Sequence, residues 1–228
     1  MLFIAEIGMN HNGHFALAGE MFRQAKLAGA DVVKMQLGWR DGPGEINRLT
    51  PEIIDQLLRI AAFYDIELLF SVIRPDAWEM LQPFQPKRVK IASRTVIDYP
   101  ELVRGIIATG LPVIVSLGMW PGETPPFGQP ANVEYLWCRS SYPAYPWDLT
   151  GMPKSFTGSP CAGYSDHSLG IEVPLLAIAR GARIIEKHFT LDKSDTTIRD
   201  HVLSATPEEF ARLVTLGRAM HRYLQAGV

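Results

Sequence analysis

Short apolar runs rich in β-branched residues alternate along the chain with longer segments whose apolar positions recur at helical spacing. The short runs predict strands at residues 2–6, 32–36, 67–71, 88–92, 112–116, 133–138, 161–164 and 183–187. The periodic segments predict helices at residues 14–28, 51–64, 75–81, 99–108, 169–179 and 207–224. Two helix starts are well marked, because Thr50 and Thr206 are each followed by proline and glutamate, a cap residue and a first turn that suit a helix.

Strands that alternate with helices form either a closed eight-stranded barrel or an open doubly wound sheet. Polar residues end nearly every predicted strand, which is how barrel enzymes build a site around one axis. An open sheet would gather them at one switch point and would carry a glycine-rich phosphate loop after its first strand, which this chain lacks. The pattern therefore predicts an α/β fold, a TIM (β/α)8 barrel, as a single domain over residues 1–228.

Residues 118–132 interrupt the alternation with four prolines and three glycines in the sequence GMWPGETPPFGQPAN. Proline removes a helical hydrogen bond and clashes with the preceding turn. We expect this loop to replace the fifth helix of the barrel. The proline-rich segment 142–160 predicts at most a short helix.

Composition narrows the class of protein further. The chain is 47% hydrophobic and 20% charged with a net charge of −2, and its charges are interspersed, so neither nucleic acid nor a membrane is an expected partner. Cys138 and Cys161 form no spaced metal motif and indicate reduced thiols. The N-terminus has no basic region, and Glu6 interrupts its apolar run too early for a signal peptide. These features predict a cytoplasmic protein.

His167 and His188 follow two late strands, in YSDHS and EKHFT. Neighbouring barrel strands would bring the two imidazoles within reach of one first-row divalent ion with open positions. Two ligands are fewer than a tight zinc site needs, and two histidines packed at a barrel mouth would give the same pattern. The spacing by itself leaves both interpretations open.

Lys34 and Lys90 lie in otherwise apolar strands, where a lysine needs an anionic partner. With hydroxyl groups at equivalent strand ends they would suit a small anion that carries phosphate and carboxylate. Those hydroxyls belong to Ser93, Ser116, Ser140 and Ser165. Internal salt bridges to Glu6 or Glu186 are the alternative.

Glu6 ends the first strand, where its carboxylate could act as a general base or form an ion pair with Lys34. The loop that follows it, with Asn10, His11 and Asn12 before Gly13, fits ordinary turn and cap chemistry.

Taken together, these segments resemble the sialic acid synthase family, which joins phosphoenolpyruvate to an aldose to give a 2-keto-3-deoxy sugar acid. The matching stretches run in family order over nearly the whole chain. They are IAEIGMNHNGH, AGADVVKMQ, VKIAS, TGLPVIVSLGM, CRSSYPAYP, GYSDHSLGIEVPLLAIARGARIIEKHFTLDK and RDHVLSATPEEF.

The resemblance implies that His167 and His188 hold a divalent metal, Mn2+ first and Mg2+ or Co2+ as alternatives, which polarises the aldehyde. It implies that Lys34, Lys90 and the four serines hold phosphoenolpyruvate. Gln36, Tyr142 and Arg94 are the other candidate substrate-binding residues. Glu6 would orient or deprotonate the attacking water, Lys90 would offset developing charge, and Asp200 would support metal-bound water or the sugar. The partners would be these small molecules, with a homodimer possible.

The chain departs from the family on the sugar side. Arg94 and Thr95 follow KIAS, where the family has an acid that contacts the sugar, and Arg139 and Arg199 stand in neighbouring strand-end loops. The chain stops after the eighth helix, so we expect the family's antifreeze-like C-terminal domain to be absent. Guanidinium groups favour planar anions, so a phosphorylated or carboxylated aldehyde is expected to be a better acceptor than N-acetylmannosamine.

Two other functions fit the same residues. A non-catalytic or partner-dependent barrel that binds an anionic metabolite would explain the altered sugar side, although both histidines, both lysines and Glu6 are present. An aldolase or lyase would use Lys34 or Lys90 as a Schiff base.

Overall fold

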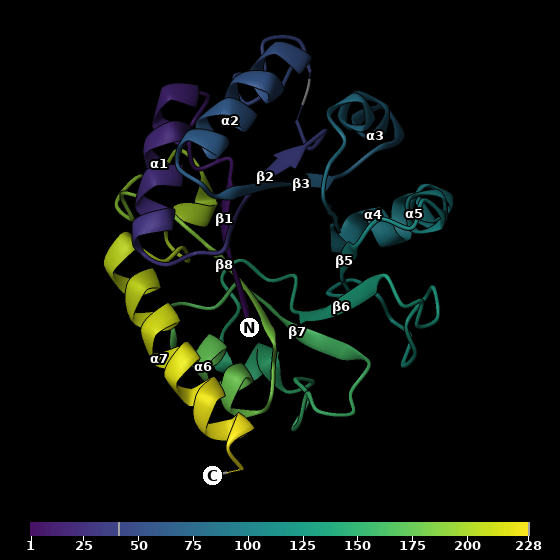
Figure 1. Ribbon diagram of the computed structural model, residues 1–228, viewed down its shortest axis with the longest axis vertical. Helices are drawn as coiled ribbons and strands as arrows, with labels where there is room; N and C mark the ends of the chain where they lie inside the picture. Colours follow the sequence, from purple (N-terminus) through teal and green to yellow (C-terminus); the bar gives the residue numbers. More distant parts are fainter. Residues whose placement is uncertain (41, 228) are drawn as a thin grey trace.

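The computed structural model describes residues 1–40 and 42–227, and eight parallel strands close into a barrel in the order β1 to β8 (Figure 1). The strands are β1 Leu2–Gly8, β2 Val32–Leu37, β3 Glu67–Val72, β4 Val89–Ile91, β5 Val113–Ser116, β6 Val133–Cys138, β7 Cys161–Asp166 and β8 Ile184–His188. The first and last strands pair directly, with Glu6 opposite His188. The predicted TIM barrel is confirmed.

Helices surround the barrel on its outside (Figure 1). They are α1 Phe15–Leu27, α2 Pro51–Phe63, α3 Pro75–Leu81, α4 Ser93–Asp98, α5 Pro100–Ala108, α6 Glu172–Ala179 and α7 Pro207–Gln225, with 3-10 turns η1 Gln82–Phe84, η2 Pro146–Leu149 and η3 Arg199–His201. The predicted caps are present, because Thr50 accepts a hydrogen bond from Ile53 N and Thr206 forms a capping box with Glu209. Pro51 and Pro207 stand in the first turns of their helices.

The proline-rich segments behave as predicted. No helix connects β5 to β6 within the described residues, so a loop takes the place of the fifth helix. Between β6 and β7 the chain forms only η2. The pattern missed α4, because six residues are too few to show a helical period. Helix α6 begins three residues later than expected because Gly170, at a φ of +70°, turns the chain before it.

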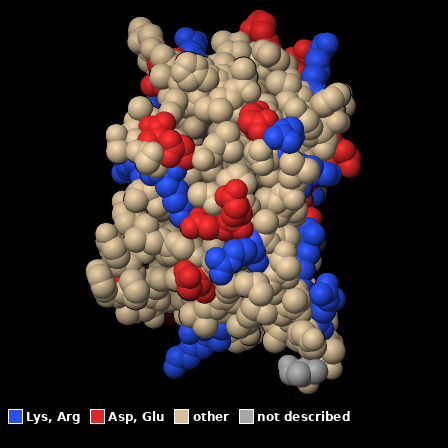
Figure 2. Space-filling model, turned by 90° about the vertical axis from the view of Figure 1, so that its left-hand side faces the viewer, with Lys and Arg blue, Asp and Glu red and all other residues tan. Residues whose placement is uncertain are grey.

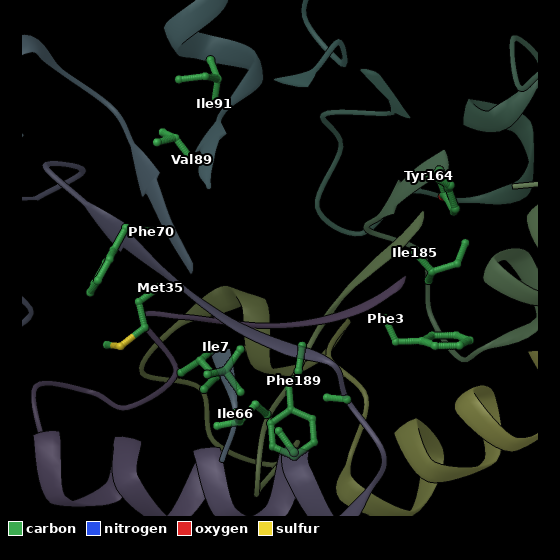
Figure 3. Packing of buried hydrophobic residues seen from close by; sticks show 14 of the residues in the cluster. Phe3, Ile7, Met35, Ile66, Phe70, Val89, Ile91, Tyr164, Ile185 and Phe189 are labelled. Atoms are coloured by element: carbon green, nitrogen blue, oxygen red, sulfur yellow. The ribbon is translucent and has the colours of Figure 1, made fainter. Parts of the chain in front are cut away.

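Alternate residues of the strands face opposite sides of the barrel wall, and each side has its own core. The side facing the helices carries Phe3, Met35, Phe70, Tyr164 and Ile185, which pack against the surrounding helices (Figure 3). The other set forms one apolar layer inside the barrel, made of Ile4, Val32, Leu69, Ile114, Leu136, Ala162 and Ile184. Polar residues stand two positions further along most of these strands, so the inner apolar layer forms the floor of a polar chamber.

One close approach fixes β7 against β8. A methyl group on Gly163 would lie 1.9 Å from the backbone oxygen of Ile184, so only glycine fits there. The contact brings the ends of the two strands together, with Ser165 opposite Glu186 and Asp166 opposite Lys187.

The surface agrees with the dispersed charges of the sequence. On the face shown in Figure 2, basic and acidic side chains are interspersed and neither sign forms a continuous field. None of the described helices is both long and apolar enough to span a membrane. Cys138 and Cys161 are free and buried, as the sequence indicated.

A buried ion pair lies on the side of the barrel wall that faces the helices. Lys187 Nζ lies 2.6 Å from Asp166 Oδ2, and both side chains are fully buried. Asp166 also accepts hydrogen bonds from the Tyr164 hydroxyl at 2.7 Å and from the backbone and side chain of Ser168. Lys187 donates in addition to the backbone oxygen of Ser168. These contacts hold the turn after β7, which carries His167.

Lys187→Met should strongly destabilise the protein, because it leaves the Asp166 carboxylate buried without its counter-ion. Removal of one partner of a buried pair costs about 3–5 kcal/mol. The matched control is Lys193→Met, which breaks a partly exposed pair with Glu209 and should cost less than about 1 kcal/mol. Urea unfolding followed by circular dichroism measures both, and equal losses in the two variants would contradict the assignment.

Candidate active site

A cavity of about 1000 Å³ opens at the carboxyl ends of the barrel strands. The structure brings every predicted site residue into its lining. These are Glu6, Lys34, Gln36, Lys90, Ser93, Arg94, Ser116, Ser140, Tyr142, Ser165, His167, His188 and Asp200. The convergence follows from the closed barrel, since parallel strands end on one face around one axis.

Four charged side chains form the base of this cavity. Lys34 Nζ lies 2.7 Å from Glu6 Oε2 and 3.7 Å from Glu186 Oε1, and Lys90 Nζ lies 3.7 Å from Glu186 Oε2. All four side chains are at most 7% exposed. The internal salt bridges that the sequence left open are therefore formed, and anion binding by the lysines stays a prediction.

Hydroxyl and amide groups complete the base. Lys90 Nζ donates to Ser116 Oγ at 2.7 Å, and Ser165 Oγ donates to Glu186 Oε1 at 2.8 Å. Gln36 Nε2 donates to Glu6 Oε1 at 3.2 Å. Glu6, Lys90 and Glu186 thus each keep a hydrogen bond besides their ion pairs. Glu6 Oε2 and Glu186 Oε2 have no hydrogen-bond partner among the described residues and meet only the lysine ammonium groups.

The surroundings shift the pKa values of Glu6 and Glu186 in opposite directions. Burial raises the pKa of Glu6 above its ordinary value, against the lowering effect of Lys34. Burial acts in the same direction on Glu186, but Lys34 and Lys90 outweigh it and lower its pKa to about 2. Two carboxyl groups separated in this way suit different roles, so Glu6 is the one fitted to exchange a proton while Glu186 stays ionised.

The pKa values of Lys34 and Lys90 are also shifted in opposite directions. Burial disfavours the charged form of Lys34, but the carboxylates of Glu186 and Glu6 outweigh burial and raise its pKa. Burial lowers the pKa of Lys90, and the charge of Lys34 adds to that effect although Glu186 opposes it. Lys34 is therefore the more firmly charged of the two.

His167 and His188 lie side by side at the wall of the cavity, with ring centroids 5.3 Å apart. His167 Nδ1 lies 2.7 Å from the backbone oxygen of Arg139, so this nitrogen carries the proton and the lone pair of Nε2 remains available. His188 Nδ1 is buried without a hydrogen-bond partner among the described residues. Burial lowers the pKa of His188, which favours its neutral form.

These features fit a divalent metal. A histidine that ligates a metal usually donates its other ring N–H to a carbonyl or carboxylate, as His167 does to Arg139. Asp200, 6% exposed, lines the same cavity, but it does not form a group of three ligands with the two histidines. No group of three or more metal-ligating side chains lies together within residues 1–40 and 42–227, so any ion would keep open positions.

Tyr142 packs against both histidines. Its ring centroid is 4.1 Å from that of His167 and 6.2 Å from that of His188. The guanidinium of Arg199 lies 4.6 Å from the centroid of the tyrosine ring, at a cation–π distance. Burial raises the pKa of the Tyr142 hydroxyl well above its ordinary value, so the hydroxyl remains a hydrogen-bond donor.

Several arginines line the cavity. Arg94 lies 5.9 Å from the ring centroid of Trp39, and its Nη1 is 3.9 Å from Asp98. Arg40, Arg139 and Arg199 also line the cavity. Thr95, which the sequence placed beside Arg94 at this position, is buried and donates to the backbone oxygens of Val72 and Ile73, so it does not face the cavity.

Sequence reasoning missed part of the lining. Cys138 lies in the cavity wall with its Sγ 3.7 Å from His167 Nδ1, and Gly118 stands beside it. A methyl group on Gly118 would lie 2.6 Å from Ser140 Oγ and 3.1 Å from Ser93 Oγ, so glycine lets these serines converge. The position of Cys138 two residues after an inward-facing leucine would have placed it inward. Trp39 and Arg40 lie in a loop, where no periodic signal exists.

Comparison with known proteins matches this chain to a family. The model of the NeuB family matches residues 45–228. The chain belongs to the NeuB family. N,N'-diacetyllegionaminic acid synthase of Legionella pneumophila is 32% identical over 98% of this chain and 73% of its own length. N-acetylneuraminate-9-phosphate synthase of Mus musculus is 31% identical over 97% of this chain and 70% of its own.

A solved structure agrees. N-acetylneuraminic acid (sialic acid) synthetase from Leptospira borgpetersenii, in complex with citrate, superposes with a TM-score of 0.84 at 29% identity, covering 98% of this chain and 84% of that chain. The resemblance to sialic acid synthases read from the motifs is therefore confirmed. This NeuB-family chain accordingly belongs with transferases that form carbon–carbon bonds.

Proposed function

We propose that this NeuB-family chain condenses phosphoenolpyruvate with an aldose or another aldehyde, giving a 2-keto-3-deoxy sugar acid and phosphate. The observation that carries the proposal is the convergence of two lysines, a set of serine hydroxyls and two neighbouring histidines in one cavity. The names of the relatives, synthases of sugar acids, support the same reaction class.

The chain's residues would act in the following way. Lys34, Lys90, Ser93, Ser116, Ser140 and Ser165 would hold the phosphate and carboxylate of phosphoenolpyruvate by charge-assisted hydrogen bonds. The negative ligand would offset the two lysines, which in its absence are balanced by Glu6 and Glu186. The Ser165 hydroxyl can turn from Glu186 to the ligand while Glu186 keeps its ion pairs with the lysines.

Bond formation joins C3 of phosphoenolpyruvate to the aldehyde carbon, and the aldehyde oxygen takes up a proton from solvent to become a hydroxyl. Water then adds at C2, and Glu6, the carboxyl with the raised pKa, accepts the proton that this water loses and later returns it to solvent. The bond from C2 to the phosphate oxygen breaks, the proton of the C2 hydroxyl passes to the departing phosphate, and the ketone and phosphate result. Tyr142, whose ring packs against His167, lies in the cavity wall beside the reacting groups.

His167 and His188, with Asp200 nearby, would hold a divalent metal, Mn2+ first, with Mg2+ and Co2+ as alternatives. When bound it supplies Lewis-acid polarisation of the aldehyde oxygen. Glu6, Lys90 and Asp200 remain the proposed catalytic residues.

A Schiff-base lyase is the second candidate function. The observation that favours it is the lowered pKa of Lys90, since an uncharged amine is the nucleophile that such chemistry needs. Lys34, whose pKa is raised, does not suit that role. Reduction with borohydride in the presence of pyruvate separates the two functions, because only a Schiff base leaves a covalent adduct on Lys90.

Phosphate release from phosphoenolpyruvate with Mn2+ and a panel of aldehydes tests the proposed function. Lys90→Ala should weaken the binding of phosphoenolpyruvate about tenfold or more, since hydrogen bonds to charged groups contribute about 1.5–3 kcal/mol. Calorimetry measures the affinity, and Lys154→Ala, outside the site, serves as the control. Unchanged affinity in both Lys34→Ala and Lys90→Ala would place the anion elsewhere.

The metal proposal predicts that Mn2+ binds the isolated protein and that a chelator removes it. The variant His167→Ala/His188→Ala should lose this binding without unfolding, because the rings lie at the mouth rather than in the apolar layers. Electron paramagnetic resonance of free Mn2+ measures binding independently of activity, with His221→Ala as the control. Undiminished Mn2+ binding by the double variant would refute the assignment.

The arginines predict an acceptor that carries a phosphate or carboxylate. One relative is named for a phosphorylated product, which agrees with an anionic acceptor. Phosphorylated sugars of several lengths should therefore release phosphate from phosphoenolpyruvate faster than N-acetylmannosamine. Arg94→Gln/Arg199→Gln should reduce kcat/KM for the anionic acceptor by about tenfold or more, since bidentate arginine contacts are strong and specific.

The control for this test is Arg59→Gln, an exposed arginine paired with Asp55 on α2. It should leave the acceptor preference unchanged. Efficient turnover of N-acetylmannosamine by the unmodified chain would show that the arginines do not select the acceptor.

A further inference from the structure

The turn after β1, residues 9–13, reaches across to the long loop that follows β8. Asn10 is 2% exposed, and its Nδ2 donates to the backbone oxygen of Phe189 at 3.0 Å and to Ser204 Oγ at 2.9 Å. Ser204 Oγ donates in turn to the backbone oxygen of Asp200 at 2.6 Å. The buried amide of Asn10 therefore bonds to both ends of the loop that follows β8. Through Ser204 it also holds Asp200, which lines the cavity.

A second contact holds the outer part of the same loop. Asn12 Nδ2 donates to Asp195 Oδ2 at 2.7 Å, and Asn12 Oδ1 lies 3.4 Å from His201 Nε2. His201 is anchored from its other nitrogen, which lies 2.7 Å from Thr190 Oγ1. Asn12 occupies the left-handed region at a φ of +50°, a conformation that asparagine tolerates better than most residues.

The loop held in this way forms one wall of the active-site cavity. Thr196, Thr197, Ile198, Arg199 and Asp200 all line it, whereas Asn10 and Asn12 lie outside the lining. Asp195 holds Thr197 as well, through its backbone N–H at 2.8 Å and its hydroxyl. Asp195 therefore connects Asn12 to Thr197, a residue of the cavity wall.

We propose that Asn10 and Asn12 are positioning residues that clamp the β8 loop so that Arg199 and Asp200 meet the acceptor. The clamp rests on the proposed function, because it supplies the acceptor wall of that reaction. It acts on the acceptor and not on phosphoenolpyruvate, since the lysines and serines come from other strands.

The chemistry of the Asn12–Asp195 pair allows an exchange test. Asn12→Asp places two carboxylates against each other and removes the only N–H donor in the pair. Asn12→Asp/Asp195→Asn restores a donor facing an acceptor, with the same net charge as the unmodified protein. In the exchanged pair the amide oxygen introduced at position 195 can still accept from Thr197.

Hydrogen–deuterium exchange of residues 190–204 measures how firmly the β8 loop is held, and it needs no substrate. Asn12→Asp should raise exchange in this segment, and the exchanged pair should return it toward the unmodified level. Asn132→Ala, which removes an equally well-bonded asparagine from the loop before β6, should leave the segment unchanged. If Asn12→Asp does not fold, Asp195→Ala breaks the same bond from the loop side.

Kinetics give the second measurement. Asn12→Asp should lower kcat/KM for the acceptor by about tenfold or more, since small misplacements of positioning groups are costly. Its affinity for phosphoenolpyruvate should stay within about twofold, and the exchanged pair should recover the acceptor kinetics. Three results would each overturn the clamp. They are unchanged hydrogen–deuterium exchange in residues 190–204 of Asn12→Asp, no recovery in Asn12→Asp/Asp195→Asn, and a loss of phosphoenolpyruvate affinity as large as the loss of kcat/KM for the acceptor.

The two proposals fail separately. If the unmodified chain releases no phosphate with any aldehyde, the proposed reaction is wrong, and hydrogen exchange still decides whether the turn after β1 holds the loop. If phosphate is released but Asn12→Asp changes nothing, the reaction stands and the clamp does not.

Discussion

The site depends on the mutual neutralisation of four charges inside a closed barrel. Glu6, Lys34, Lys90 and Glu186 are almost wholly removed from water. An isolated ion in such a place costs several kcal/mol, and the cost is offset only when opposite charges and hydrogen bonds surround it. Two carboxylates and two ammonium groups, supported by Ser116, Ser165 and Gln36, meet that condition.

The barrel's layering makes this cluster possible. Directly below the cluster, seven apolar side chains fill the interior of the barrel, so the charged groups pack against an apolar layer. Above it the cavity opens to solvent between the loops. A ligand that enters meets ammonium groups whose carboxylate partners are already in place, so an anion shares these ammonium groups with Glu6 and Glu186. Electrostatic preorganisation of this kind is where enzymes gain much of their rate.

The two sides of the cavity are built in different ways. The charged base is carried by strands, whose positions the barrel fixes through paired backbones. The opposite wall comes from the β8 loop, which depends on side-chain contacts such as those of Asn10 and Asn12. Loops tolerate substitution more readily than paired strands do. The loop wall is therefore the part of the cavity that substitution can change most easily.

The sequence by itself determined the barrel, the missing fifth helix and the set of residues at the strand ends. It could do so because buried parallel strands are short apolar runs rich in β-branched residues, helices have a period of 3.6, and prolines forbid a helix. Adjacency along the barrel even suggested the pair of Glu6 and Lys34, which lie on neighbouring strands.

Only the tertiary structure decided contacts that no period encodes. Lys90 meets Glu186 across the interior because the barrel closes, and Asn12 meets Asp195 from a turn 183 residues away. The short helix α4 and the turn of Thr95 away from the cavity were likewise beyond the pattern. Such contacts depend on side-chain direction and on how loops fold back over the strand ends, which packing settles after the strands have been placed.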